Sequence, residues 1–143
     1  MLRGRFEHNI DAKGRLFVPS KLREKLGEKF VAAVAFDQCI NLYSEERWTA
    51  LLASVETLPA GEAFAMQRYL SSNAADVQID AQGRILIPKH LLTFAALEKA
   101  ALIVGAGDRA EIWNPDLYEE ANALMTPEKV KDQFMKLTFA PRQ

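Results

Sequence analysis

The sequence predicts an α+β fold built from two copies of one unit, related by a pseudo-twofold axis. Residues 11–19 read DAKGRLFVP and residues 80–88 read DAQGRILIP, with five identical positions and three more that are apolar in both copies. Each copy alternates short apolar runs, typical of strands, with helical patterns. A copy of this length would bury little core alone, so we expect the two copies to share one.

Length and composition match one folded domain. The chain has 143 residues, of which 49% are hydrophobic and 26% are charged, and such values argue against a disordered chain. No stretch approaches 18 consecutive apolar residues, so no membrane span is expected, and the N-terminus lacks the apolar core of a secretory signal. The single cysteine, Cys39, cannot form an internal disulfide, which favours a reducing cytoplasm and excludes a cysteine-based zinc cluster.

The formal charge of −1 hides an uneven distribution along the chain. Residues 1–25 carry seven basic and three acidic side chains, whereas residues 26–125 carry seven basic and fourteen acidic ones. Residues 126–143 carry four basic and two acidic side chains. This asymmetry indicates a polyanionic partner more strongly than the near-neutral total does.

Each copy is expected to begin with two short strands joined by a tight turn. In the turn, the aspartate of Asp-Ala-Lys/Gln-Gly can bond the backbone ahead of it, and the glycine accepts a positive φ. Pro19 and Pro88 end this part and suit the first turn of a following helix. The strands are predicted at residues 6–10, 16–18, 77–80 and 85–87, and the helices at residues 20–26 and 89–97.

The second part of each copy is expected to contain two more strands and a capped helix. Ser44 and Asn114 are good N-caps, and Pro115 suits the first helical position after Asn114. The strands are predicted at residues 30–36 and 100–104 and in the segments that end at Tyr43 and Trp113, with turns at residues 37–38 and 105–108.

Further helical patterns follow each copy. Residues 48–58 carry an apolar face at helical spacing, residues 59–61 break it, and residues 64–70 suggest a second helix. Another helix is indicated at residues 117–125. Thr126 then serves as the N-cap of a helix that reaches about Leu137, before a frayed tail at residues 138–143.

No catalytic or metal-binding motif stands out. The sequence lacks nucleophile-elbow, zincin and phosphate-loop motifs. Two histidines, His8 and His90, without a cysteine pair are poor material for a metal site. Cys39 lies in an apolar segment, where a buried structural cysteine is the better interpretation. We therefore expect no enzyme activity, cofactor or small-molecule substrate, and a hydrolase built on Cys39 is the weaker alternative.

The duplicated turns are the candidate binding elements. Arg15 and Arg84 recur at the same place in both copies, and a guanidinium fork suits guanine O6/N7 or phosphate oxygens. Lys13 of the first copy is replaced by Gln82, which can still bond a base edge or a phosphate. A purely structural interpretation stays open, in which each aspartate caps its turn and pairs with its arginine at the surface.

The two motifs resemble the swapped-hairpin motif of AbrB-like, MazE-like and SpoVT-like DNA-binding domains. Together with RGRF at residues 3–6, LY at residues 42–43 and EIW at residues 111–113, they resemble the MraZ family of bacterial transcriptional regulators. The resemblance implies a duplicated AbrB-like swapped-hairpin β-barrel with flanking helices in one chain. It also implies cytoplasmic, nucleoid-associated homo-oligomeric rings that bind short direct DNA repeats upstream of their own operon in the division and cell-wall gene cluster, and typically repress it.

The resemblance assigns roles to particular residues and parts of the chain. The alternative to this DNA-binding function is an antitoxin-like or scaffolding ring that binds an acidic protein instead of duplex DNA. The four parts are repeat 1 (residues 5–48), a helical connector (49–75), repeat 2 (76–119) and a C-terminal helix and tail (120–143). The resemblance implies DNA contact at Arg15 and Arg84, with Lys13 and Gln82 beside them, and organisation of the turns at Asp11 and Asp80. From their own chemistry, Arg3 and Arg5 are expected to add DNA contact through attraction to phosphates, and Gly14 and Gly83 to help organise the turns.

Overall fold

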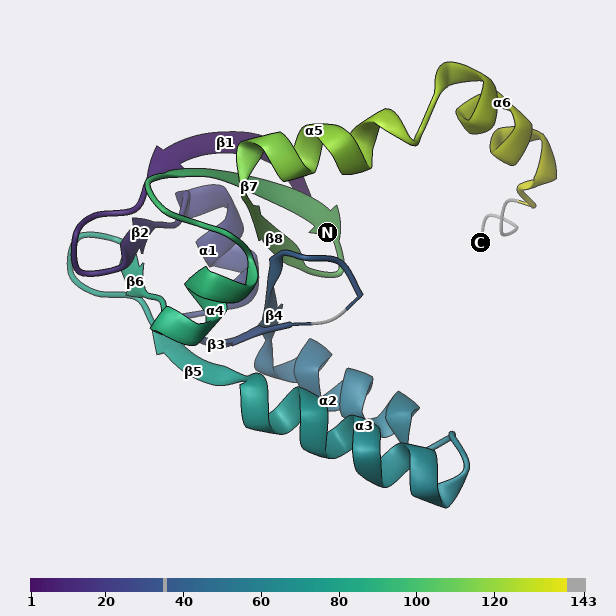
Figure 1. Ribbon diagram of the computed structural model, residues 1–143, viewed down its shortest axis with the longest axis horizontal. Helices are drawn as coiled ribbons and strands as arrows, with labels where there is room; N and C mark the ends of the chain where they lie inside the picture. The colour runs from purple at the N-terminus through teal and green to yellow at the C-terminus, as the bar shows by residue number, and fades with distance from the viewer. Residues whose placement is uncertain (35, 139–143) are drawn as a thin grey trace.

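The computed structural model describes residues 1–34 and 36–138, which form a six-stranded antiparallel sheet, a two-stranded ribbon and surrounding helices (Figure 1). The strands are β1 (Leu2–Asn9), β2 (Arg15–Phe17), β3 (Lys29–Ala33), β4 (Ile40–Ser44), β5 (Ala75–Gln78), β6 (Arg84–Leu86), β7 (Ala100–Gly107) and β8 (Ala110–Trp113). The helices are α1 (Ser20–Leu26), α2 (Glu45–Val55), α3 (Ala60–Asn73), α4 (Lys89–Phe94), α5 (Pro115–Ala123) and α6 (Pro127–Lys136).

The strand order shows that the two copies exchange their first strands. In the sheet, whose order is β1-β7-β8-β4-β3-β5, β1 of the first copy pairs with β7 of the second, and β5 of the second pairs with β3 of the first. In the ribbon, Leu16 lies opposite Ile85, which is its own counterpart in the repeat. Asn41 of β4 likewise lies opposite its counterpart Glu111 of β8. These self-paired positions mark the pseudo-twofold axis, and the predicted duplicated swapped-hairpin fold is confirmed.

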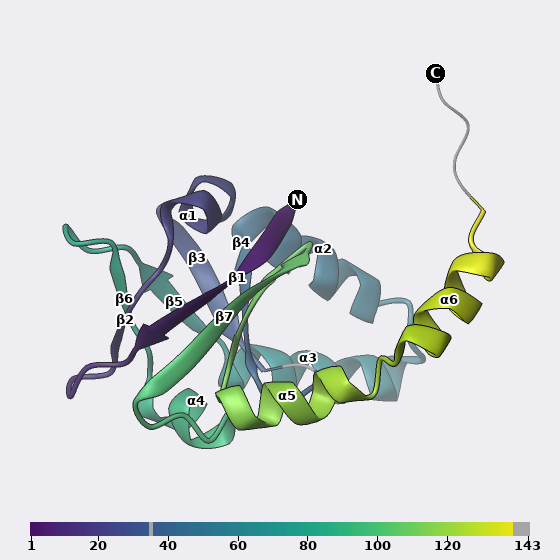
Figure 2. The ribbon, with the colours of Figure 1, turned by 90° about the horizontal axis from the view of Figure 1, so that it is seen from above.

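The ladder of the six-stranded sheet does not close into a barrel among the described residues, because β1 and β5 remain its edges. Each edge strand continues through a turn into the ribbon of β2 and β6, as Figure 2 shows. Two equivalent backbone hydrogen bonds join the two copies beside the ribbon. Val18 N–H donates to Gly83 O and Ile87 N–H donates to Gly14 O, both at 2.9 Å. The β2–β6 ribbon therefore connects the edge strands β1 and β5, which are not joined to each other by backbone hydrogen bonds.

One apolar core is shared by both copies. Leu16 and Ile85, and likewise Leu22 and Leu91, are counterparts that lie in the same buried cluster. Two smaller clusters repeat the symmetry on the other face of the sheet. Tyr43 packs against Trp48 of α2, and Trp113 packs against Tyr118 of α5. The division of the chain at residues 48, 75 and 119 stays a prediction.

The helix caps that the sequence predicts are confirmed. The Ser44 hydroxyl accepts the N–H of Arg47 at 3.2 Å, and the Thr126 hydroxyl accepts the N–H of Lys129 at 3.2 Å. Asn114 Oδ1 accepts backbone N–H groups at the start of α5, where Pro115 occupies the first turn. Among the described residues, no helix has the length and apolar character needed to cross a membrane.

Several predicted strand boundaries are wrong. The strand β1 covers Leu2–Asn9 instead of residues 6–10, and β5 covers Ala75–Gln78 instead of residues 77–80. The residues 105–107 belong to β7 and the chain reverses at residues 108–109, because β1 starts at Leu2 and pairs along the whole of β7. β3 ends at Ala33 instead of Phe36, since neither β4 nor β5 pairs with it beyond that residue. Phe36 is 99% exposed as a result.

Two predicted helix boundaries are also wrong. The helix α4 ends at Phe94 rather than Leu97, and Ala96 follows with a φ of 54°, a left-handed conformation that cannot continue a helix. The break between α2 and α3 covers residues 56–59 instead of 59–61, because Pro59 serves as the N-cap residue of α3. The predicted tail at residues 138–143 lies, except for Thr138, outside the described residues.

A substitution at Gly105 tests the pairing of β1 with β7, on which the exchange of first strands depends. Gly105 lies opposite Gly4, and a Cβ at Gly105 would collide with the backbone of Arg3. We expect Gly105→Ala to lower the free energy of unfolding by roughly 1–3 kcal/mol through overpacking. The matched control is Gly61→Ala in α3, where a Cβ meets nothing within 4 Å, and which should raise that free energy by about 0.5–1 kcal/mol. Urea titrations that show the same sign for both variants would contradict this register.

Candidate nucleic-acid interface

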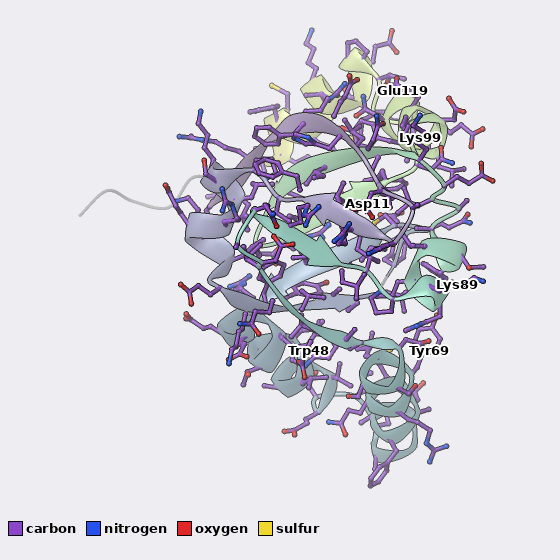
Figure 3. All side chains as sticks on the ribbon, turned by 90° about the vertical axis from the view of Figure 1, so that its left-hand side faces the viewer. Asp11, Trp48, Tyr69, Lys89, Lys99 and Glu119 are labelled. Carbon is purple, nitrogen blue, oxygen red and sulfur yellow. The ribbon has the colours of Figure 1, made fainter. Side chains whose placement is uncertain are left out.

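The first turn (residues 11–15) and the second turn (residues 80–84) lie at the same end of the molecule (Figure 2). Figure 3 looks onto this end, with Asp11 labelled near the middle of the face. Arg84 Nη1 of the second turn lies 3.8 Å from Asp11 Oδ2 of the first turn. The exchange of strands therefore brings together two motifs that are far apart in the sequence.

In the first turn, the carboxylate of Asp11 holds both the backbone and the arginine. Asp11 Oδ1 accepts the backbone N–H groups of Lys13 at 3.0 Å and of Arg15 at 2.9 Å. Asp11 Oδ2 accepts from Arg15 Nε at 2.7 Å. Gly14, with a φ of +84°, donates its N–H to Asp11 O at 3.0 Å and closes the turn. The Arg15 side chain is thus fixed by the same carboxylate that shapes the loop.

The second turn repeats this geometry with one difference. Asp80 Oδ1 accepts the N–H groups of Gln82 and Arg84, both at 2.9 Å, and its Oδ2 accepts from Arg84 Nε at 3.1 Å. Arg84 Nη2 also donates to Gln82 Oε1 at 3.0 Å. A lysine ammonium has no acceptor atom and cannot make this bond. The change from Lys13 to Gln82 therefore exchanges a positive charge for a side chain that orients the arginine.

Both arginines keep donors for a ligand. The exposed fraction is 32% for the Arg15 side chain and 28% for that of Arg84. In Arg15 the ion pair uses Nε, and its two terminal nitrogens make no hydrogen bond among the described residues. Because a planar guanidinium offers two parallel N–H groups, such a side chain can donate to a phosphate or to guanine O6/N7.

The hydrogen bonds of the turns depress the pKa of both aspartates. The largest cause in each case is the backbone N–H of the arginine four residues later, Arg15 for Asp11 and Arg84 for Asp80, which stabilises the carboxylate. Partial desolvation acts in the opposite direction without reversing the shift. Since the folded pKa is depressed, the stabilisation is present at neutral pH and is lost as the pH falls through that value.

Different side chains support the two turns from behind. A Cβ at Gly14 would lie 3.5 Å from Leu92 of α4, whereas a Cβ at Gly83 would lie 3.1 Å from Arg23 Nη1 of α1. The repeat aligns Arg23 with Leu92, so Gly83 lies against the Phe17 ring and the Arg23 guanidinium, whereas Gly14 lies near the apolar Leu92. The Arg23 guanidinium stacks over the ring of Phe17 at 5.5 Å.

Three basic residues near this end were not among the predicted site residues. Arg23 lies behind the second turn, the Lys99 carbonyl accepts the N–H of Ile10 at 2.7 Å beside the first turn, and Lys89 follows Pro88 at the start of α4. The basic run of residues 21–25 is the signal that could have found Arg23. Lys89 and Lys99 stand alone in the sequence, and only the fold places them here.

The structure does not bring Arg3 and Arg5 to the turns. Both lie in the first half of β1, and Arg3 is about 20 Å from Asn9 at the usual rise of a strand. The Arg5 guanidinium stacks over the Tyr118 ring at 5.0 Å and donates to its hydroxyl at 3.4 Å. With Lys21 and Lys25, these arginines line a separate groove of about 480 Å³. A contact of Arg3 and Arg5 with DNA stays a prediction.

The groups considered for catalysis lie in separate environments. Cys39 is 1% exposed and donates to Asn41 Oδ1 at 3.4 Å, and burial raises the pKa of its thiol. The His8 ring packs on Phe17 at 5.1 Å, and His90 Nε2 lies 3.1 Å from the carbonyl oxygen of Asn73. In residues 1–34 and 36–138, no group of histidine, cysteine, aspartate and glutamate side chains could hold a metal ion.

The depressed pKa of Asp11 can be measured directly by a carbon-13 NMR titration of its carboxyl group. We expect a midpoint below the ordinary value of about 3.9, because two backbone N–H groups and Arg15 Nε bind the carboxylate. In the Arg15→Ala variant the two backbone hydrogen bonds remain, so the midpoint should rise only part of the way. A wild-type midpoint at or above the ordinary value would show that the carboxylate does not organise the turn.

Comparison with known proteins agrees with this architecture. A family model described as "MraZ protein, putative antitoxin-like" matches residues 1–68 and 70–134. A relative from Heliobacterium modesticaldum is 45% identical over 129 residues, which cover 89% of this chain and 90% of the relative. One from Thermoanaerobacter sp. (strain X514) is 45% identical over 122 residues (84% and 85%), and one from Ligilactobacillus salivarius is 46% identical over 121 residues (83% and 85%). All three are named "Transcriptional regulator MraZ", and the chain belongs to the MraZ family.

Proposed function

We propose that the chain is a sequence-specific DNA-binding transcriptional regulator. It binds short direct repeats upstream of its own operon as a ring oligomer and represses the division and cell-wall gene cluster. The observation that carries the proposal is the pair of turns at one end, each of which presents an arginine fixed by an aspartate. The name "Transcriptional regulator MraZ" of the relatives supports the regulatory role.

The aspartate–arginine pairing suits recognition because it orders the guanidinium before DNA arrives. An unrestrained arginine loses side-chain entropy of about 2 kcal/mol when it is immobilised. In both turns, the bond from Nε to the aspartate carboxylate has already restricted the side chain. The terminal nitrogens of Arg15, which make no hydrogen bond among the described residues, can then donate to a base edge or a phosphate, and Lys13 adds charge beside the first turn.

One chain offers a small cationic surface, because it has two such turns on a protein of net charge −1. Several chains that engage neighbouring repeats together would convert weak contacts into tight binding through a high effective concentration. A ring that binds chromosomal DNA in this way would be found in the cytoplasm, on the nucleoid.

A second candidate function is a protein-interaction ring of the antitoxin-like kind. It is favoured by the wording "putative antitoxin-like" of the matching family model. In that case the basic turns would bind an acidic protein. Gel-shift titration with the DNA upstream of the chain's own gene separates the two, since only the DNA-binding regulator should retard this duplex more strongly than an unrelated duplex of equal length.

Replacement of Arg15 tests the proposed DNA contact. We expect Arg15→Ala to weaken binding to the upstream DNA by roughly 1–3 kcal/mol for each chain that engages a repeat, with a larger total effect when several chains bind together. The matched control is Arg68→Ala, an exposed arginine on α3 outside the turns, which should leave the affinity unchanged. A folded Arg15→Ala protein that binds this DNA like the wild type would exclude the contact.

The difference between the two turns predicts a difference in salt dependence. Lys13→Gln gives the first turn the residue of the second, and should lower the slope of log K against log salt by about one for each engaged chain. Gln82→Lys should raise it by a similar amount. Fluorescence anisotropy with labelled upstream DNA at several salt concentrations measures both slopes. Slopes that match the wild type would show that the side chains at positions 13 and 82 do not contact phosphates.

A further inference from the structure

Helix α6 presents an apolar face that its own chain leaves largely uncovered. The helix projects away from the sheet after α5, on a short connection at residues 124–126 (Figures 1 and 2). Val130, Phe134 and Leu137 follow helical spacing and share one face, and Phe134 and Leu137 are 61% and 55% exposed. An isolated helix of ten residues is marginal in water, so this face needs a partner to be stable.

The equivalent helix of the first copy has such a partner. In chain order α3 follows α2 as α6 follows α5, and α3 folds back along α2 while α6 does not fold back along α5 (Figure 1). Leu70 of α3 is 5% exposed, whereas none of the residues of α6 is buried. The helices that follow the two copies therefore differ in how they are packed.

An open apolar groove lies on the α2–α3 hairpin. Its volume is about 470 Å³, and Phe36 forms part of its wall at 99% exposure. Met66 and Tyr69, exposed by 42% and 48%, lie in the same groove. The full lining consists of Phe36, Leu51, Val55, Met66, Tyr69 and Leu70.

Position and charge indicate which helix fits this groove. Helix α6 leaves the sheet on the flank opposite the α2–α3 hairpin of its own chain (Figure 1), and only residues 124–126 connect it to α5. Helix α6 carries three lysines against Glu128 and Asp132, whereas the hairpin, residues 45–73, carries four glutamates against Arg47 and Arg68. The helix and the hairpin that carries the groove therefore have opposite net charge, while the lining of the groove itself is uncharged. We propose that α6 of one chain docks into the α2–α3 groove of a second copy of this chain.

This contact joins two different surfaces, so each chain offers one helix and one groove. Such a heterologous contact forms a ring when the rotation between neighbours closes. The inference rests on the proposed function in that it names the contact that would place several pairs of turns beside one another on DNA.

The first test compares variants of the helix and of the groove by size-exclusion chromatography with light scattering. We expect an oligomer for the wild type, and monomers for Phe134→Glu in α6 and for Met66→Glu in the groove. Gln133→Glu, which adds the same charge beside the apolar face of α6, is the matched control and should stay oligomeric. A monomeric wild type, or an unchanged oligomer in both the Phe134→Glu and Met66→Glu variants, would overturn the proposal.

The second test identifies the two surfaces directly by cross-linking. Cys39 is 1% exposed, so it should not form disulfides that compete with those of cysteines introduced at the surface. A mixture of Phe134→Cys chains and Met66→Cys chains should form a disulfide-linked heterodimer under mild oxidation, and a chain with both changes should form a ladder of multimers. Homodimers alone, no cross-link, or a disulfide within one chain would each contradict docking between copies.

The same variants separate failure of this inference from failure of the proposed function. Arg15→Ala should lose DNA binding and remain oligomeric. Phe134→Glu should lose the tight binding that several chains give, by roughly 100-fold or more, and keep a weak, salt-dependent binding by single chains. If Phe134→Glu is monomeric but Arg15→Ala binds the upstream DNA normally, the docking of α6 is supported and the proposed DNA contact by the turns is wrong.

Discussion

The exchange of first strands between the two copies is the constraint on which the rest of the structure depends. Because β1 pairs with β7 and β5 pairs with β3, the chain that leaves each edge strand must cross to the ribbon of β2 and β6. This path places both turns at one end, close enough for Arg84 to lie 3.8 Å from Asp11. The leucines and isoleucines of both copies are buried in one shared core, which holds the two turns on one face.

Within this symmetric frame, the two turns are chemically different. The first turn has a lysine beside its arginine and an apolar support, Leu92, behind its glycine. The second turn has Gln82, which bonds Arg84, and Arg23 behind its glycine. We infer that the first turn contributes more attraction to phosphate at its tip, while the second holds its arginine in a more defined direction. The two equivalent positions of the repeat therefore carry different charge.

Much of the fold was predictable because the chain repeats itself. The motif DAKGRLFVP/DAQGRILIP located both turns, and Ser44, Asn114 and Thr126 located three helix starts by ordinary capping chemistry. The ends of β3 and β7 were not predictable from apolar runs, since strand length here depends on where the neighbouring strand stops. The same holds for the site: the two turns follow from the motif, but the distance of Arg3 from them and the nearness of Lys99 follow only from the fold.

The central claim is that both turns contact DNA as one surface. Hydrogen exchange measured by mass spectrometry, with and without the DNA upstream of the chain's own gene, tests it most directly. The account predicts slower exchange at residues 11–15 and 80–84 when this DNA is bound, with smaller changes in the α2–α3 hairpin. Protection elsewhere, with exchange in both turns unchanged, would contradict it.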